Sequence, residues 1–294
     1  MKAFPECIPC VLRQAIQVID MLKLGKLKRQ QILSAVMDEL EGIDVLKYTP
    51  PGITNVVHDK LKELTGVKDL YKSVKKKYNK FALKLYPKLK KVIAESSDPL
   101  NTAVRLAIAG NVIDYGASSS FDLETAIENV LVANFAVDHF DRFKKVLRKS
   151  KEILYVGDNA GEIVFDKLLV EELAKVAPAC PSGRRVTFAV KSSPILNDAL
   201  IGDAKEVNML KVAHAIESGS RDAGTTISEG TGEFKKIYKK ADLILAKGQG
   251  NLETFGGRKE IFYLLMVKCP YLARPLHLKK NDIILASNKL WRIK

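Results

Sequence analysis

Residues 151–166 read KEILYVGDNAGEIVFD, an apolar run that stops at Gly157 and a segment with helical periodicity that starts at Glu162. This order predicts a buried strand, a tight turn and a helix. An acid and an amide, Asp158 and Asn159, stand side by side in the turn. One Asp after a strand is an ordinary helix N-cap, so a second polar side chain at this point suggests an additional role.

The same alternation of strand and helix continues to the end of the chain. Further strands are expected in five segments, RRVTFAVK, KVAHAIES, DLILAKG, EIFYLLMVKC and DIILAS, with helical stretches between most of them. Strands joined by crossover helices predict a mostly parallel sheet with helices on both faces. The expected fold class is therefore α/β, with its core in residues 98–294.

The chain before residue 98 is expected to be helical. Apolar residues recur at three- and four-residue spacing in three segments, 10–24, 27–40 and 53–64. Pro50-Pro51-Gly52 breaks this series, and Asp98-Pro99 is a capped start of a buried helix. No linker rich in Gly, Ser or Pro separates the two parts, so residues 1–97 should form an N-terminal α-helical region packed on the core.

The composition limits the classes of function. No apolar run in the 294 residues approaches the roughly 20 that a membrane span needs, and no signal-peptide pattern opens the chain. A cytoplasmic location without a membrane partner is expected. The net charge of +14 would attract any anion, but many lysines between 60 and 91 recur at helical intervals, which is typical of a solvated helix face. Nucleic acid is not the expected partner, because neither stacking aromatics nor a known binding module accompanies them. The oligomeric state is left open.

Two of the four cysteines, Cys7 and Cys10, have the spacing of a metal or redox pair. Cys180 and Cys269 are far apart in the sequence and supply no second close pair, which a four-cysteine zinc site usually needs. A structural metal or redox role and a plain helix start are both compatible with this pattern.

Polar side chains follow four of the expected strands, at the point where each strand ends. These groups are Asp158 and Asn159, then Asn197 and Asp198, then Ser218 and Gly219, and finally Lys247 with Asn251 and Glu253. Parallel strands bring their carboxyl ends to one edge of a sheet, where ligands bind. Asn111 and Asp114, three residues apart near the end of the helix that Asp98 opens, are expected to line the same site.

The residue types at this edge indicate a metal and a phosphate. Asp158, Asn159 and Asp198 offer oxygen ligands, which suit magnesium or manganese. The first amides of the helix after Gly161 favour an anion, and Lys247 supplies a point charge for a phosphate oxygen. Each residue alone has an ordinary structural explanation, but their recurrence at successive strand ends favours phosphoryl transfer.

Four alternatives follow from parts of the pattern. The turn GDNAGE lacks the G-x-G-x-x-G of dinucleotide-binding folds, and it lacks the Asp-x-Asp of haloacid-dehalogenase-type phosphatases. A kinase-like transferase would be expected to carry G-x-x-x-x-G-K-[ST], which is absent from the sequence. A non-catalytic binder of phosphometabolites or RNA, using the basic helical face, stays open as the alternative from another class.

Taken together, these motifs resemble the damage-control phosphatase family, metal-dependent phosphatases formerly grouped as a domain of unknown function. The resemblance covers the whole chain and rests on six stretches: Cys7-x-x-Cys10, AGNVIDYG (109–116), GDNAGEIVFD (157–166), PILNDA (194–199), Ser218-Gly219 and KGQGNLET (247–254). The CxxC is similar to that of a branch with archaeal and plant members. The loop SGSRDAGT (218–225) departs from the expected family form at Arg221 and Ala223.

The resemblance implies hydrolysis of phosphomonoesters such as sugar phosphates, phosphopantetheine-like compounds or other damaged phosphometabolites. It implies that Asp158, Asn159 and Asp198 hold a divalent cation (Mg, Mn, Co or Ni), and that Asp158 and Lys247 are catalytic. Substrate contacts are expected from the polar residues of the matching stretches, namely Asn111, Asp114, Glu162, Asn197, Ser218, Gly219, Lys247 and Asn251.

Overall fold

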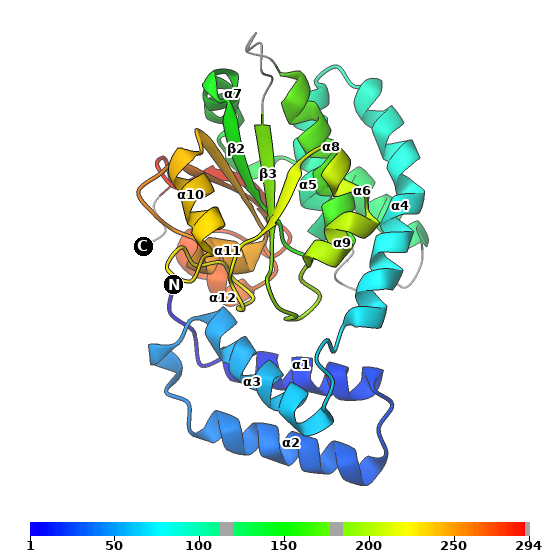
Figure 1. Ribbon diagram of the computed structural model, residues 1–294, viewed down its shortest axis with the longest axis vertical. Coiled ribbons are helices and arrows are strands. Elements are labelled where there is room, and N and C mark those ends of the chain that lie inside the picture. The colour runs from blue at the N-terminus through cyan, green and yellow to red at the C-terminus, as the bar shows by residue number, and fades with distance from the viewer. Residues whose placement is uncertain (112–119, 177–184, 292–294) are drawn as a thin grey trace.

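The computed structural model describes residues 1–111, 120–176 and 185–291, with the backbone alone at 120–124. The described residues form a central seven-stranded sheet of order β1-β7-β6-β5-β2-β3-β4 (Figure 1). The strands are β1 (Phe135–Asp138), β2 (Glu152–Val156), β3 (Arg185–Val190), β4 (His214–Glu217), β5 (Leu243–Lys247), β6 (Ile261–Met266) and β7 (Ile283–Ser287). All neighbours pair in parallel except β6 and β7. The predicted α/β class with a mostly parallel sheet is confirmed.

Helices cover both faces of the sheet because the central strands are apolar on both sides. Ile153 and Tyr155 of β2 pack into one apolar cluster, whereas Leu154 and Val156 pack into another on the opposite face. The first cluster includes residues of α4 (Lys72–Ala94), α5 (Pro99–Ala109), α6 (Ser120–Val132), α7 (Phe140–Lys149), α8 (Glu162–Lys175) and α9 (Ile201–Glu206). The second includes residues of α10 (Gly232–Lys240), α11 (Gln249–Thr254) and α12 (Pro270–Ala273). Short 3-10 turns occur at Val45–Lys47, Met209–Lys211 and Arg274–Leu276.

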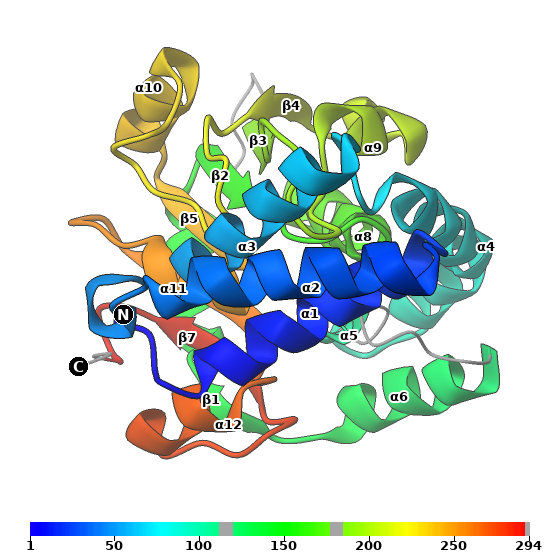
Figure 2. The same cartoon turned by 90° about the horizontal axis from the view of Figure 1, so that it is seen from below.

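Three N-terminal helices pack around an apolar cluster of their own. They are α1 (Cys7–Met21), α2 (Lys26–Glu41) and α3 (Pro50–Thr65), and Val11, Ile32 and Val57 lie at their centre. Figure 1 shows them together below the sheet, and in Figure 2, which is seen from below, they lie in front of it. Helix α3 contacts α11, which follows the carboxyl end of β5. These helices therefore lie over the carboxyl edge of the sheet.

Two local features differ from the sequence prediction. Pro50 and Pro51 begin α3 instead of only separating helices, because proline fits the first turn and the Thr49 hydroxyl accepts from the Gly52 amide at 3.1 Å. Helix α4, which the sequence grouped with the N-terminal region, packs through Leu89 and Ile93 into the sheet cluster. The boundary at residue 97 stays a prediction, but by apolar packing α4 belongs with the core.

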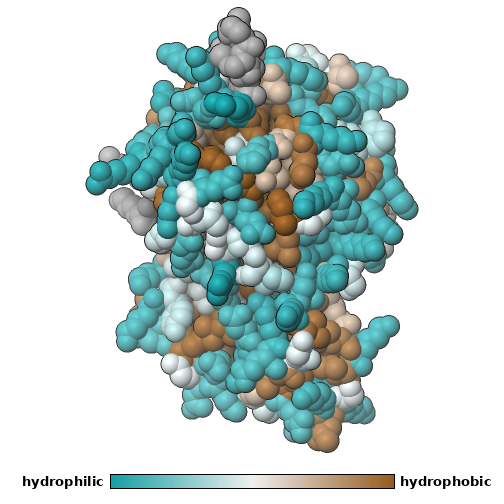
Figure 3. Space-filling view, viewed as in Figure 1, coloured by the Kyte–Doolittle hydropathy of each residue, from teal (hydrophilic) through white to brown (hydrophobic). Residues whose placement is uncertain are grey.

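The helix expected from Asp98-Pro99 is present as α5, and the Asp98 carboxylate accepts from the Asn101 amide at 3.0 Å. Strand β1 and the antiparallel pairing of β7 were not predicted. β1 has only four residues, which alternate between half-buried and exposed. A strand this short and this little buried has no apolar run that would distinguish it from the end of a loop. Hydrophilic residues cover much of the face shown in Figure 3. Within the described part of the chain, no helix has the length and apolarity required to cross a membrane.

Candidate active site

The site lies where the direction of the chain through the sheet reverses. From β2 the chain moves outward through β3 to β4, and it then returns to the other side of β2 as β5. The carboxyl ends of β2 and β5 flank this point, which is where open α/β sheets bind ligands. Asp158 and Asn159 follow β2, Asp198 follows β3, and Lys247 ends β5, so three of the four predicted strand ends meet here.

Backbone hydrogen bonds hold the turns after β2 and β3 against each other. Asn159 and Asp198 form an isolated antiparallel bridge. On either side of it, the Ala160 amide donates to the Asn197 carbonyl at 2.9 Å and the Ala199 amide donates to the Asp158 carbonyl at 2.8 Å. The two acids and the amide are buried, with 9%, 6% and 3% of Asp158, Asn159 and Asp198 exposed. The pairing therefore fixes three oxygen-bearing side chains on adjoining turns.

This donor set fits a divalent cation. Asn159 Nδ2 donates to Asp158 Oδ2 at 3.0 Å and to Glu162 Oε2 at 3.3 Å. The oxygen of the same side-chain amide, Oδ1, is the atom that would ligate a cation. Two carboxylates and one amide oxygen suit a hard or borderline ion. The turn after β5 also approaches closely: Gly248 has φ +78°, and a Cβ there would lie 1.9 Å from Asp158 Oδ2.

Lys247 is enclosed beneath these turns. Its Nζ donates to the Ala107 carbonyl at 2.8 Å and pairs with Asp166 Oδ1 at 3.1 Å and with Glu162 Oε1. Burial lowers the pKa of Lys247, but the Asp166 and Glu162 carboxylates outweigh it, so the pKa stands above its ordinary value. Burial, partly opposed by Lys247, raises the pKa of Asp166 to about 7. The phosphate contact expected for Lys247 stays a prediction, since all three of its N–H groups already have acceptors.

The sequence favours an anion at the amides of residues 161–163, where α8 begins, but two of these three amides have acceptors within the protein. The Gly161 amide donates to Asn79 Oδ1 at 2.7 Å, and the Ile163 amide donates to the Asn159 carbonyl at 3.2 Å. Asn79 is buried and also donates through Nδ2 to Asp203 and Glu206, at 3.0 Å each. The sequence prediction missed this residue because it lies in the lysine-rich helix α4, which resembles a solvated surface.

The loop after β4 is attached to the end of β3. The Gly219 amide donates to Ser192 Oγ at 2.7 Å, and the Ser218 amide donates to the Val190 carbonyl at 2.8 Å. Gly219 has φ +92°, and a Cβ there would lie 2.5 Å from the Thr231 nitrogen, so only glycine fits. The fourth predicted strand end thus joins the same edge through its backbone.

A second lysine, Lys191, was missed by the sequence prediction and lies beside the proposed ligands. Its Nζ is 3.7 Å from Asp198 Oδ2 and donates to Thr225 Oγ1 at 3.2 Å. Burial lowers its pKa, although the carboxylates of Asp198, Asp158 and Asp222 oppose that shift. The sequence feature that could have identified Lys191 is its place as the one charged residue at the end of an otherwise apolar strand segment, VTFAVK.

The remaining predicted residues are distributed around the site. Asn251 Nδ2 donates to the Lys247 carbonyl at 2.7 Å and to the Gly157 carbonyl at 3.3 Å, which ties the turns after β5 and β2 together. Asn111 is buried at the end of α5, next to Gly110, which packs against Glu162. Asp114 lies outside the described residues.

Cys7 and Cys10 lie at the start of α1, and both are free thiols. Burial is the largest cause of the raised pKa of each. Over the described ranges, no group of three or more His, Cys, Asp and Glu side chains is placed to hold a metal ion. A metal or redox role for the pair stays a prediction.

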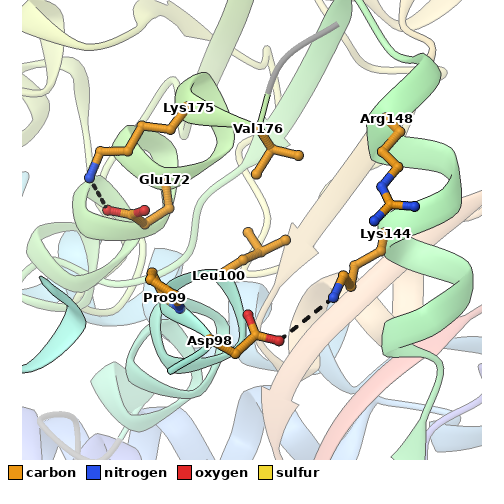
Figure 4. Close-up of a pocket in the computed structure, with 8 residues that line it drawn as sticks. All are labelled: Asp98, Pro99, Leu100, Lys144, Arg148, Glu172, Lys175 and Val176. Atoms are coloured by element: carbon orange, nitrogen blue, oxygen red, sulfur yellow. Dashed lines mark hydrogen bonds and ion pairs between the residues drawn. The ribbon is translucent and has the colours of Figure 1, made fainter. Parts of the chain in front are cut away.

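A hollow of about 390 Å³ lies at the opposite edge of the sheet (Figure 4). It is lined by Asp98, Pro99, Leu100, Lys144, Arg148, Glu172, Lys175 and Val176. Two of the basic side chains that line the hollow form ion pairs with acids that also line it, Lys144 with Asp98 at 3.7 Å and Lys175 with Glu172 at 2.5 Å. None of the predicted catalytic residues lines this hollow, so it is not part of the site.

Comparison with known proteins gives one family across nearly the whole chain. The model of the damage-control phosphatase ARMT1-like domain matches residues 3–284. An uncharacterized protein of Methanocaldococcus jannaschii is 33% identical, and the match covers 97% of this chain and 95% of that protein. A damage-control phosphatase of Pyrococcus horikoshii is 32% identical, with 98% and 99% covered.

Two further comparisons agree. A damage-control phosphatase of Archaeoglobus fulgidus is 30% identical over 97% of this chain and 98% of its own. The crystal structure of a protein from Pyrococcus horikoshii, described as a DUF89 family protein, superposes with a TM-score of 0.88 at 30% identity. That superposition covers 98% of this chain and 99% of the other.

Proposed function

Because this chain belongs to the damage-control phosphatase family of the ARMT1-like domain, we propose that it is a metal-dependent phosphatase of small phosphorylated metabolites. The observation that carries the proposal is the bridge between Asn159 and Asp198, which joins two oxygen-bearing turns at the switch point of the sheet. Sugar phosphates, phosphopantetheine-like compounds and other damaged phosphometabolites are the candidate substrates.

Asp158, Asn159 and Asp198 would hold the divalent cation, with Mg, Mn, Co and Ni as candidates. Such an ion would supply positive charge to the phosphoryl oxygens, the main requirement of phosphoryl transfer. The amide in this set keeps the number of carboxylates at two, which limits their mutual repulsion. The bridge between the turns would fix the three oxygens before substrate arrives, so little reorganisation would accompany binding.

Lys247 and Glu162 support the site from below. Glu162 Oε2 accepts from Asn159 Nδ2, and Glu162 Oε1 pairs with Lys247. This chain of contacts would fix the orientation of the Asn159 amide beside Asp158. Lys247 therefore acts first as a positioning residue, and a direct phosphate contact would require it to leave one of its three acceptors.

Two routes of attack are compatible with this arrangement. In one, water attacks phosphorus and the ester oxygen leaves with a proton. In the other, an Asp158 carboxylate oxygen forms the bond to phosphorus, the alcohol leaves, and water then releases phosphate. Intact-protein mass after an acid quench separates them, because the second route adds a hydroxylamine-sensitive phosphoryl group at Asp158 and the first adds none.

The N-terminal helices would limit the size of the substrate. Asn55 of α3 accepts from the Ala223 amide at 3.3 Å, so α3 contacts the loop that follows β4. Helix α3 also contacts α11 beside the Lys247 turn. Helices on this edge leave access to compact phosphate esters, and they favour metabolites over phosphorylated proteins as substrates.

The direct test is hydrolysis of a chromogenic phosphomonoester with Mg, Mn, Co or Ni, before and after chelation. Hydrolysis should need the metal and should fall at least about a hundredfold in Asp158→Asn and Asp198→Asn, which keep the side-chain shape while removing charge. Activity unchanged in both variants would remove the proposal.

The alternative function rests on the exposed lysines of α4, among them Lys76, Lys77 and Lys80. A non-catalytic RNA or phosphometabolite binder would use this basic face and would not depend on Asp158. It predicts salt-sensitive RNA binding that survives Asp158→Asn. A salt titration with single-stranded RNA, on the wild type and on that variant, distinguishes the two functions.

A further inference from the structure

Two lysines, Lys247 and Lys191, are buried at the carboxyl edge of the sheet, and they differ in how many of their N–H groups have an acceptor. Lys247 has three acceptors for its three N–H groups. Lys191 is 2% exposed, and across the described residues its Nζ has one hydrogen bond, to Thr225 Oγ1 at 3.2 Å, and one longer ion pair, to Asp198 at 3.7 Å. A buried ammonium favours three close acceptors. Lys191 therefore has donor capacity that the described residues do not fill.

The position of Lys191 places its ammonium group between Asp198 and the loop that follows β4. The residue extends β3, and its amide donates to the Ala199 carbonyl at 3.0 Å, next to Asp198. Its Nζ lies on the side of Asp198 that faces the loop after β4, where Thr225 is 1% exposed. Because Thr225 Oγ1 accepts from Lys191, its hydroxyl proton remains for another acceptor.

The loop that carries Thr225 is held by side-chain hydrogen bonds and by a close contact at Gly224. Ser220 Oγ donates to the Gly224 carbonyl at 2.6 Å. The Thr254 hydroxyl, which donates to the Gly250 carbonyl at 2.8 Å, has the Thr225 carbonyl as a second acceptor at 3.2 Å. A Cβ at Gly224 would lie 2.1 Å from Thr254 Oγ1, so the contact depends on glycine. Thr225 is thus fixed from both sides before any ligand arrives.

Several other anion donors at this edge are already engaged. The Gly161 amide just before α8 and the Ile163 amide in its first turn have acceptors within the protein, and so does Lys247. We propose that Lys191 Nζ and the Thr225 hydroxyl bind the phosphoryl oxygens of the substrate beside Asp158 and Asp198. This rests on the proposed phosphatase function and assigns the phosphate contact within it to Lys191.

The proposal makes opposite predictions for the metal and for the anion. Lys191 repels a cation held by Asp158 and Asp198, so Lys191→Met should bind Mn²⁺ more tightly, by about tenfold. The same variant, loaded with Mn²⁺, should bind inorganic phosphate roughly 10- to 100-fold more weakly, because a charge-assisted donor is lost. A lysine that only supported the fold would weaken both when removed.

The test is calorimetric titration of Mn²⁺ alone, and then of inorganic phosphate into the Mn²⁺-loaded protein. Lys191→Arg should restore phosphate affinity to within a few fold. Lys167→Met is the matched control: Lys167 is 8% exposed on α8, donates to the Val207 carbonyl at 3.3 Å, and should leave both affinities unchanged when replaced.

Thr225→Val gives a second measurement if Lys191→Met does not fold. It should weaken phosphate binding about three- to tenfold while Mn²⁺ affinity stays at the wild-type value. Wild-type phosphate affinity in Lys191→Met or Thr225→Val, with an active parent enzyme, overturns the assignment and leaves the phosphatase proposal standing. A parent that binds no metal and hydrolyses no ester overturns both.

Discussion

His58 should make the stability of this protein depend on pH in a predictable way. It lies on α3, its side chain is 0% exposed, and neither ring nitrogen has a hydrogen-bond partner among the described residues. Its ring packs near that of Tyr71, with 5.9 Å between the centroids. Burial lowers the pKa of His58 from 6.5 to about 4, with Lys62 adding to the shift and Asp59 opposing it.

The sign and size of the effect follow from proton linkage. An unfolded chain binds the His58 proton near pH 6.5, whereas the folded chain binds it only near pH 4. Between these values the unfolded state holds more protons, so stability falls as the pH is lowered through that window. At about 1.4 kcal/mol for each pKa unit, the free energy of unfolding should lose about 3 kcal/mol.

The assay compares the wild type with His58→Phe by urea unfolding, followed by circular dichroism, between pH 7 and pH 4. Phenylalanine keeps a ring against Tyr71 and cannot be protonated. The variant should gain about 3 kcal/mol relative to the wild type as the pH falls across this range. Burial raises the pKa values of Asp166 and Glu253 to about 7, but both groups titrate in both proteins and cancel in the difference.

A stability difference that stays constant with pH would refute the reasoning, because it would mean that His58 is not held neutral by burial. His214→Phe is the control, since His214 is on the surface beside Glu233 and its replacement removes a histidine without changing the core. Since α3 also carries Asn55, acid should loosen the helices over the active site, and hydrolysis should decline in the same pH window.

Three further outcomes are expected. Lys247→Met should lower the free energy of unfolding by about 3–5 kcal/mol in urea, because two buried carboxylates lose their cation. Gly248→Ala should weaken Mn²⁺ binding in a calorimetric titration, because its Cβ would lie 1.9 Å from Asp158 Oδ2, whereas Gly256→Ala, with nothing within 4 Å, should not. Asn79→Ala should cost about 1–3 kcal/mol in thermal unfolding, because the buried Gly161 amide, which precedes α8, loses its acceptor.

The strand ends could be predicted from the sequence because their position depends on local pattern and on one topological rule. Apolar runs that stop at Gly157 and Lys247 mark where strands end, and parallel pairing brings those ends together. The antiparallel pairing of β6 with β7 could not be predicted, because it depends on where a short chain segment returns. β1 was missed for the related reason that half of its residues are exposed.

The partners of the site residues could not be predicted in the same way. Lys247 appeared available for a phosphate, because the acceptors that fill its donors come from α5 and from two successive turns of α8. Asn79 appeared to be part of a solvated face, because lysines beside it such as Lys76, Lys77 and Lys80 are exposed, whereas Asn79 and Lys75 turn inward. Sequence pattern locates polar residues at an edge, whereas hydrogen-bond saturation depends on contacts between distant segments.

The two buried lysines explain how one edge can hold a cation and an anion together. Glu162 and Asp166 carry negative charge that Lys247 neutralises, and the raised pKa of Asp166, caused first by burial, reduces that charge near neutral pH. Glu162, Asp166 and Lys247 together therefore contribute little net charge to a ligand bound at Asp158 and Asp198. Asp158 and Asp198 would balance a divalent ion, so they would no longer offset the charge of Lys191, and Asp222 would be the carboxylate that still acts on it. A phosphate ester is the ligand that this remaining charge favours, because it contacts the cation and Lys191 at once.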